Sequence, residues 1–138
     1  MKRIYSVPDT LDVFHDDQEK YIILKWTSFD ISLEEIKKMH AEILTYAVSQ
    51  RCYIFVADTS KTISALSESI LKWWNDEWIN TLVKNGIEMI ITILPMNAKT
   101  QLSTLQWQKG NYGTIRMENV LLLEQVNYLV REHYRNKT

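Results

Sequence analysis

Glycine is scarce in this chain, with three glycines among 138 residues. Nucleotide-binding loops of the Walker and dinucleotide types need several glycines at fixed spacing, because the backbone must approach the phosphates closely. Gly86, Gly110 and Gly113 fit neither spacing, and the G-x-S-x-G turn that presents a nucleophilic serine is also missing. The sequence therefore excludes these recognised loops and this elbow. We expect a protein that is not an enzyme and uses no cofactor.

Cysteine occurs once, as Cys52, so no disulfide can form within the chain. Cys52 begins an apolar run, where a buried and inert thiol is the usual state, and its only basic neighbour is Arg51. The three histidines, His15, His40 and His133, are too far apart to form a zinc motif. We therefore expect packing roles for the histidines and no metal site.

An excess of charge and a long apolar run are both missing. The chain has 16 basic and 17 acidic residues, interspersed, for a net charge of −1. No basic stripe exists to bind a phosphate backbone, so nucleic acid is not an expected partner. The longest apolar runs, such as residues 90–95, fall short of the ~20 residues that cross a bilayer, and no apolar leader segment follows Met1. We expect a cytoplasmic protein without a membrane span.

What the chain does contain is enough apolar material for one core. Hydrophobic residues make up 46% of it and charged residues 24%. That composition offsets the entropy of ordering the chain, and a length of 138 residues suits one domain over residues 1–138. Linkers, repeats and low-complexity tracts are absent from the sequence.

The first half of the sequence predicts a hairpin, a helix and a buried strand. Residues 11–15 and 20–27 have strand character and are separated by a polar turn at 16–19. Ser32 and Glu35 form an S-x-x-E capping box that predicts a helix over residues 33–49. The apolar run at residues 52–57 is typical of a covered parallel strand.

Helices and strands alternate in the second half. The predicted elements are a helix from Ser67 to Gly86, a strand at 87–94, a shorter helix at 97–108, a strand at 114–117 and a helix at 121–134 with Leu122, Val126, Leu129 and Val130 inward. The order is ββαβαβαβα. We therefore predict an α/β fold, with a mostly parallel mixed sheet, an N-terminal antiparallel hairpin and flanking helices.

The stretch LKWWNDEW, residues 71–78, holds three of the five tryptophans. On a wheel of 100° per residue, Trp74 and Trp78 fall on the stripe that faces the core, together with Ile70 and Leu82. Trp73 falls away from the centre of that stripe, beside polar residues. The wheel therefore predicts a boundary or exposed position for Trp73, where a tryptophan could contribute to a protein interface.

A second candidate site lies at the end of the strand predicted over residues 52–57. Asp58, Thr59 and Ser60 follow this strand at the edge where open α/β sheets bind ligands, and Ser67 starts the next helix, whose N-terminus attracts anions. The same residue types are also typical of turns and helix caps. We favour the turn and cap interpretation and keep the polar site as the alternative.

Residues 53–95 carry a family resemblance. An apolar strand that ends in Asp58 precedes a tryptophan-bearing helix, a glycine-capped helix end at Gly86 and a strand that stops at Pro95. This arrangement resembles the SpoIIAA-like (STAS/SEC14-like) proteins. The resemblance implies a compact α/β domain that acts by binding, as STAS-type domains do in anti-sigma-factor antagonists, stressosomes and the tails of anion transporters.

The phospho-switched members of that family have two serine motifs, D-[LFI]-S-G and a later D-S-S-G. Residues 58–61, DTSK, share the Asp and the Ser of the first motif and lack its glycine. Residues 66–69, LSES, stand at the second, where the Asp and the Gly are missing and Glu68 takes the place of the phosphorylated serine. This departure argues against a phospho-switch.

Two functions follow as hypotheses. The first is a non-enzymatic regulatory module that binds a protein partner or a second copy of itself, as a homodimer, through a surface that includes Trp73. The alternative is a SEC14-like carrier of a small apolar or lipid-like ligand, with a pocket at the strand ends near Asp58, Ser60 and Asn97. Such a carrier needs an enclosed apolar cavity of roughly 300 Å³ or more.

Overall fold

One mixed sheet organises the protein, for which the computed structural model describes residues 1–62, 64–95 and 113–137. Its strands, in both spatial and chain order, are β1 (Lys2–Val7), β2 (Leu11–Asp16), β3 (Tyr21–Trp26), β4 (Ile54–Asp58), β5 (Met89–Ile93) and β6 (Arg116–Val120). β1, β2 and β3 pair antiparallel, whereas β3 to β6 pair parallel. The predicted α/β fold with a mixed, mostly parallel sheet is confirmed.

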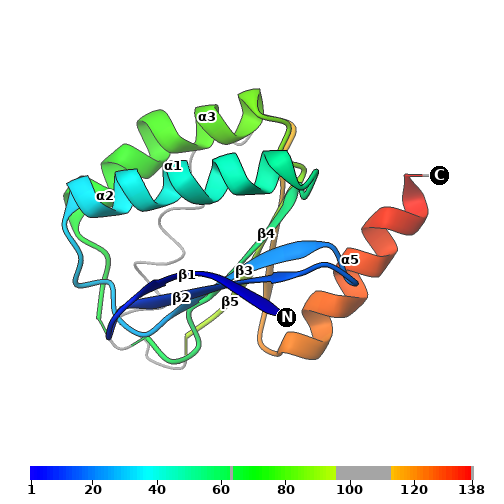
Figure 1. Ribbon diagram of the computed structural model, residues 1–138, viewed down its shortest axis with the longest axis horizontal. Helices are drawn as coiled ribbons and strands as arrows, with labels where there is room; N and C mark the ends of the chain where they lie inside the picture. The colour runs from blue at the N-terminus through cyan, green and yellow to red at the C-terminus, as the bar shows by residue number, and fades with distance from the viewer. Residues whose placement is uncertain (63, 96–112, 138) are drawn as a thin grey trace.

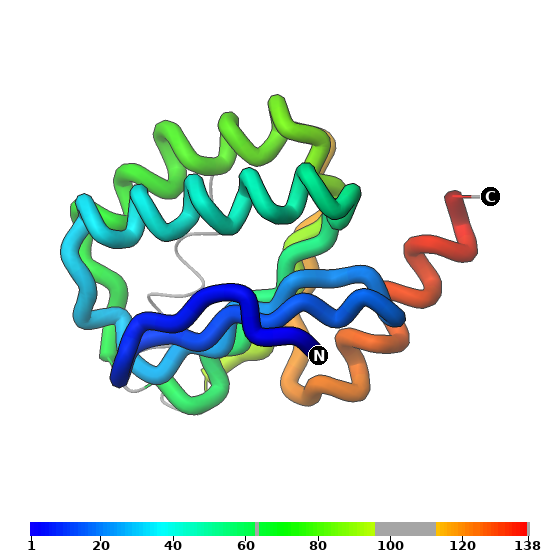
Figure 2. Tube along the Cα trace, viewed as in Figure 1, coloured from blue at the N-terminus to red at the C-terminus, as the bar shows by residue number. Residues whose placement is uncertain are grey.

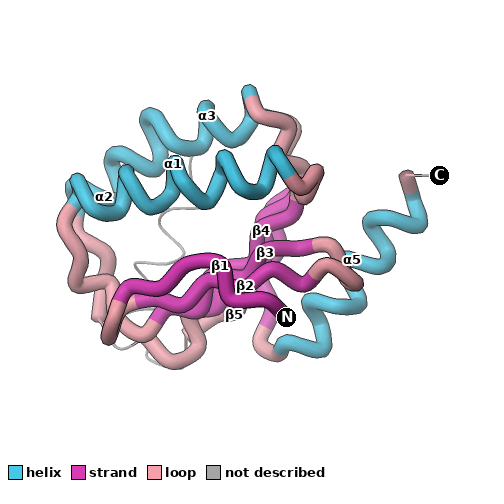
Figure 3. Tube along the Cα trace, viewed as in Figure 1, coloured by secondary structure: helices cyan, strands magenta, loops and turns pink. Residues whose placement is uncertain are grey.

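The helices cover both faces of this sheet. They are α1 (Leu33–Ser49), α2 (Glu68–Trp73), a π-helical turn η1 (Trp74–Trp78), α3 (Ile79–Lys84) and α5 (Leu123–Asn136). α2, η1 and α3 follow one another without a break as one rod. Figure 1 and Figure 3 show α1 beside this rod on one side of the sheet, with α5 apart from both. Each parallel strand is added on the same side of the one before it, so crossovers of one hand place their helices on one face.

The two faces carry separate cores because side chains alternate along each strand. In β3, Ile22 and Leu24 pack in the core under α1 and the α2–α3 rod, and Tyr21 and Ile23 pack in the core under α5. β4 and β5 are buried on both faces in the same way. This burial explains why the central strands are continuous apolar runs in the sequence.

Helix α1 begins and ends where the sequence predicts. The Ser32 hydroxyl accepts a hydrogen bond from the backbone N–H of Glu35 at 3.1 Å and satisfies one of the free donors of the first turn. At the other end, Arg51 has a φ of 53° and reverses the chain, and the backbone N–H of Cys52 bonds to the Ala47 carbonyl at 2.9 Å. Polar caps thus fix both ends of this helix.

The sequence prediction misses β1 and shifts β6. β1 carries Lys2 and Arg3, has no fully buried residue, lies at the edge of the described sheet and pairs there with β2, so its apolar alternation is weak. The predicted N-terminal hairpin is therefore part of a three-stranded antiparallel unit. β6 ends at Val120, three residues beyond the predicted strand. The predicted helix at 97–108 lies outside the described residues.

Polar contacts tie α5 to the sheet. Figure 2 follows the chain through β6 into this last helix. The Glu88 carboxylate accepts from Lys137 Nζ at 2.7 Å and lies 3.0 Å from His133 Nε2. Burial acts to raise the pKa of Glu88, but the hydrogen bonds from Lys137 and His133 outweigh it and lower the pKa. Arg131, two residues before His133, pairs with Glu19.

Truncation of Val126 tests how much α5 contributes to stability. Val126 is fully buried against the sheet, so Val126→Ala removes buried methyl groups and leaves a small cavity. We expect the free energy of unfolding to fall by about 2 kcal/mol. Urea denaturation followed by circular dichroism measures this change. Asn136→Ala, at an exposed position of the same helix, should change it by less than about 0.5 kcal/mol; equal stability of the two variants would contradict the packing.

Candidate functional site

The three residues after β4 use their polar atoms within the fold. Asp58 Oδ1 accepts hydrogen bonds from the Ser60 backbone N–H at 3.0 Å and from the Ser60 hydroxyl at 2.7 Å. The Thr59 hydroxyl is buried and donates to the Ile93 carbonyl of β5 at 2.7 Å. These bonds close a turn and join the ends of two strands. The geometry supports the turn interpretation favoured from the sequence.

Ser67 lies in a different place, at the start of α2. Its hydroxyl accepts from the backbone N–H of Ile70 at 3.3 Å, which confirms the predicted cap. With Ser64, Ala65 and residues 27–31, Ser67 lines an open groove of about 540 Å³. Asp58, Thr59 and Ser60 do not line this groove. The four polar residues predicted as one site are thus divided between two places, and Asn97 lies outside the described residues.

The order of the described strands does not create the crevice in which ligands usually bind at strand ends. Doubly wound sheets bind ligands in the crevice where the strand order reverses and neighbouring loops diverge to opposite faces. Among the strands described here, β3 to β6 follow one another in a single direction. The described sheet therefore has no such crevice next to Asp58.

The prediction that Trp73 lies at a boundary or exposed position is wrong. Trp73 is 7% exposed, and its ring stacks on that of Trp78 with centroids 5.4 Å apart. The cause is the π-helical turn, in which the N–H of Ile79 bonds to the carbonyl of Trp74, five residues back. The wider turn places residues five apart above one another, which a wheel of 100° per residue cannot represent. The predicted burial of Trp74 and Trp78 is confirmed.

His40 lies at the centre of this aromatic cluster. Four tryptophan rings surround its imidazole, with centroid distances of 6.3 Å to Trp26, 5.5 Å to Trp73, 6.2 Å to Trp74 and 5.2 Å to Trp78. Its Nδ1 lies 2.9 Å from the Ile36 carbonyl oxygen. Because a carbonyl only accepts, Nδ1 carries the proton and Nε2 is left as an acceptor. Burial lowers the pKa of His40 to about 4, although the bond to Ile36 opposes this shift.

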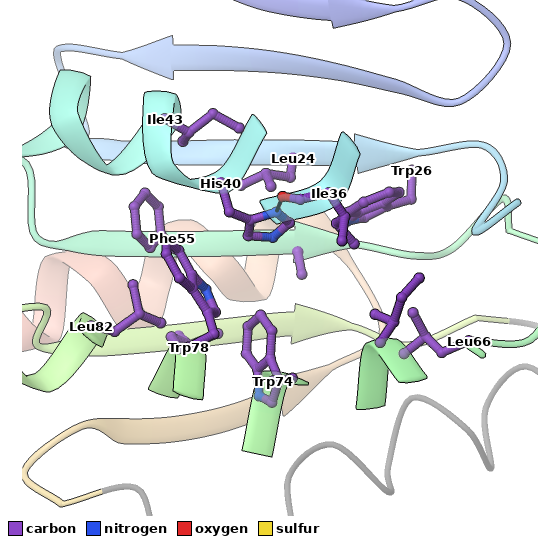
Figure 4. A pocket seen from close by; sticks show the side chains of 13 residues that line it. Leu24, Trp26, Ile36, His40, Ile43, Phe55, Leu66, Trp74, Trp78 and Leu82 are labelled. Atoms are coloured by element: carbon purple, nitrogen blue, oxygen red, sulfur yellow. Dashed lines mark hydrogen bonds between the residues drawn. The ribbon is translucent and has the colours of Figure 1, made fainter. Parts of the chain in front are cut away.

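A cavity of about 40 Å³ opens next to His40, between the sheet and the helices (Figure 4). Its walls come from β3, α1, β4, η1 and neighbouring elements, and they include Leu24, Ile36, Phe55, Trp74 and Trp78. It lies inside the core and not at the strand ends. Sequence reasoning missed it, because only the position of His40 on the apolar face of its helix hinted at a polar group there.

A surface feature was also missed. Leu121, Leu122, Leu123 and Tyr128 are 64%, 59%, 40% and 66% exposed. The predicted inward position of Leu122 is wrong, because α5 begins only at Leu123. Tyr128 lines an open groove of about 360 Å³ between the end of β6 and the first turns of α5. We call these four residues the leucine surface.

Other classes of site find no support in the described residues. No three His, Cys, Asp or Glu side chains gather there as a metal would require, and no helix among them is long and apolar enough to cross a membrane. Cys52 is buried, as predicted. That burial raises the pKa of its thiol to about 11 and keeps it protonated.

Truncation of Trp73 tests whether its side chain is buried. Trp73→Ala should lower the free energy of unfolding by about 3–5 kcal/mol, because it removes a buried ring from a stacked cluster. Urea denaturation followed by circular dichroism gives the value. Lys72→Ala, one residue earlier and exposed, should change it by less than about 0.5 kcal/mol. A Trp73→Ala variant as stable as Lys72→Ala would refute the buried position.

The burial of His40 predicts a dependence of stability on pH. In the unfolded chain His40 takes up a proton near its ordinary pKa of 6.5, whereas the folded protein resists protonation down to about pH 4. The unfolded state binds more protons in this window, so stability falls as the pH decreases through it. Relative to His40→Phe, the wild type should lose about 3 kcal/mol more between neutral pH and about pH 4. An imidazole that titrates by NMR near 6.5 in the folded protein would contradict this prediction.

Comparison of the chain with protein-family models, with curated proteins and with solved structures finds no match. The chain itself is an α/β domain built on a mixed sheet of the six described strands, antiparallel at its N-terminal side and parallel beyond β3.

Proposed function

We propose that this chain is a non-enzymatic interaction module of the STAS-like type, which binds a protein partner or a second copy of itself through the leucine surface. The observation that carries the proposal is the exposure of four large apolar side chains within eight residues of the chain, from the end of β6 into the first turns of α5. Single exposed apolar residues are common on proteins, but gathered ones mark interaction sites. The leucine surface takes the place that the sequence interpretation gave to Trp73.

Hydrogen bonds hold the leucine surface in one conformation. Gln125 Oε1 accepts from the backbone N–H groups of Leu121 at 2.8 Å and Leu122 at 3.0 Å. Just before them, the Val120 carbonyl accepts from the N–H of Leu94 at 2.9 Å. A segment that is already ordered loses less entropy when a partner binds, so more of the contact energy appears as affinity.

The fold supports the STAS-like part of the proposal. A mixed sheet with antiparallel N-terminal strands, followed by parallel strands with helices between them, agrees with the domain that the sequence resembles. The phospho-switch is not part of the proposal, because Glu68 stands at the position of the regulated serine and Ser67 caps a helix. The module would act by binding alone.

The carrier alternative has weaker support. A lipid-like ligand needs an enclosed apolar cavity of roughly 300 Å³ or more, and the cavity beside His40 measures about 40 Å³. The groove near Ser67 is larger but open to solvent. Neither feature favours a carrier of large apolar molecules over the interaction module.

The double variant Leu122→Ser with Tyr128→Ser tests the leucine surface. Both side chains are exposed, so their loss should leave the fold intact and weaken association by more than about tenfold. Sedimentation velocity over a wide range of concentration measures self-association. Affinity capture from the source cells, with mass spectrometry, measures association with another protein.

The matched control is Val48→Ser, which replaces an exposed apolar residue on α1, across the sheet from α5. We expect Val48→Ser to self-associate, or to retain its captured partner, as the wild type does. A double variant that matches the wild type in both measurements would refute the proposal. So would a strictly monomeric wild type that captures no specific protein.

A further inference from the structure

Among the described residues, the wall of the cavity beside His40 is apolar apart from one ionisable side chain. Leu24, Ile43, Phe55 and the two η1 tryptophans are among the lining residues, and His40 is the one titratable residue among the described side chains of the wall. Figure 4 shows the imidazole pointing from α1 toward Trp74 and Trp78. A pocket of this kind recognises a molecule by fit and by one hydrogen bond.

The free nitrogen of His40 supplies that hydrogen bond. His40 is 7% exposed, and its Nδ1–H is directed to the Ile36 carbonyl. No described residue donates a hydrogen bond to Nε2. A ligand with an O–H or N–H group would supply a donor to this acceptor.

Water fits this cavity poorly, although the volume would admit it. A buried water needs roughly 10–15 Å³ and typically about three hydrogen-bond partners, and the cavity of about 40 Å³ is lined almost wholly by carbon. Its volume corresponds to about three or four groups of that size. A ligand that fits both the apolar wall and the acceptor Nε2 of His40 has one hydrogen-bond donor attached to a short hydrocarbon group.

The π-helical turn is a second, independent sign of a site. A π-turn inside an α-helix is less stable than a regular turn and is frequently found at functional positions. Here the turn spans Trp74 to Trp78, and both of these end residues line the cavity. The π-helical segment of the rod therefore contributes to the wall of the cavity that also contains His40.

We propose that this cavity is a binding site for a small uncharged alcohol of about four non-hydrogen atoms, whose hydroxyl donates to Nε2 of His40 while its hydrocarbon part lies against Trp74 and Trp78. This site is separate from the leucine surface, which lies on the opposite side of the sheet around α5. The interaction module would thereby also carry an internal ligand site.

A matched pair of probes tests the proposal. 2-Propanol and acetone have the same heavy-atom skeleton, but only 2-propanol has a donor. Titration of each into the isotopically labelled full chain, followed by NMR of the indole N–H and imidazole nitrogen signals, should give saturable shifts for 2-propanol. Acetone should bind about tenfold more weakly, the effect of one lost hydrogen bond. Equal affinity for the two probes, or no saturable shift with 2-propanol, would overturn the proposal.

Two variants locate the binding inside the core. His40→Phe should remove the preference for 2-propanol over acetone, and Ala57→Leu, which adds carbon to a lining position, should abolish binding of both. If His40→Phe fails to fold, Ala57→Leu and the pair of probes still decide the question. Leu122→Ser should bind 2-propanol as the wild type does. Unchanged binding in a folded Ala57→Leu variant would place the probe elsewhere and refute the site.

Discussion

The direction in which the sheet grows constrains everything else in this protein. Each parallel strand from β3 to β6 is added on the same side of its predecessor. Crossovers of one hand then place α1 and the α2–α3 rod together on one face, and the other face is left for a helix that comes after the last strand. Both cores depend on this arrangement. The tryptophan-rich core forms between the sheet and the layer made by α1 and the α2–α3 rod, and among the described helices α5 covers the second core.

As a consequence, the two faces of the sheet carry two different candidate sites. On one face, a wide turn of the rod gathers aromatic rings around a neutral histidine and leaves a small apolar space. On the other, the start of α5 presents leucines to solvent because Gln125 holds the backbone in place. Neither feature depends on the loop after β4, where Asp58 closes a turn and Thr59 joins the ends of two strands.

Much of this fold could be predicted from the sequence, because helix caps and apolar runs are local signals. Ser32 and Glu35 specify where α1 begins, and the apolar runs around β4 and β5 specify covered strands. β1 was not predicted from the sequence, because Lys2 and Arg3 leave this edge strand with little apolar alternation. The position of Trp73 could not be predicted, since the π-turn that follows it leaves no periodic signal in the sequence. The cavity could not be predicted for a related reason, because its walls come from residues that are far apart in the chain.

The position of α5 in the chain also affects how the protein is made. The side of the sheet that it covers carries Tyr21, Ile23, Ile54, Val56, Met89 and Ile91. A ribosome releases all of these side chains before it releases Val126 and Val130, which shield them. During synthesis this apolar face of the nascent sheet therefore stays exposed until α5 has been made. In that interval it can bind chaperones or aggregate.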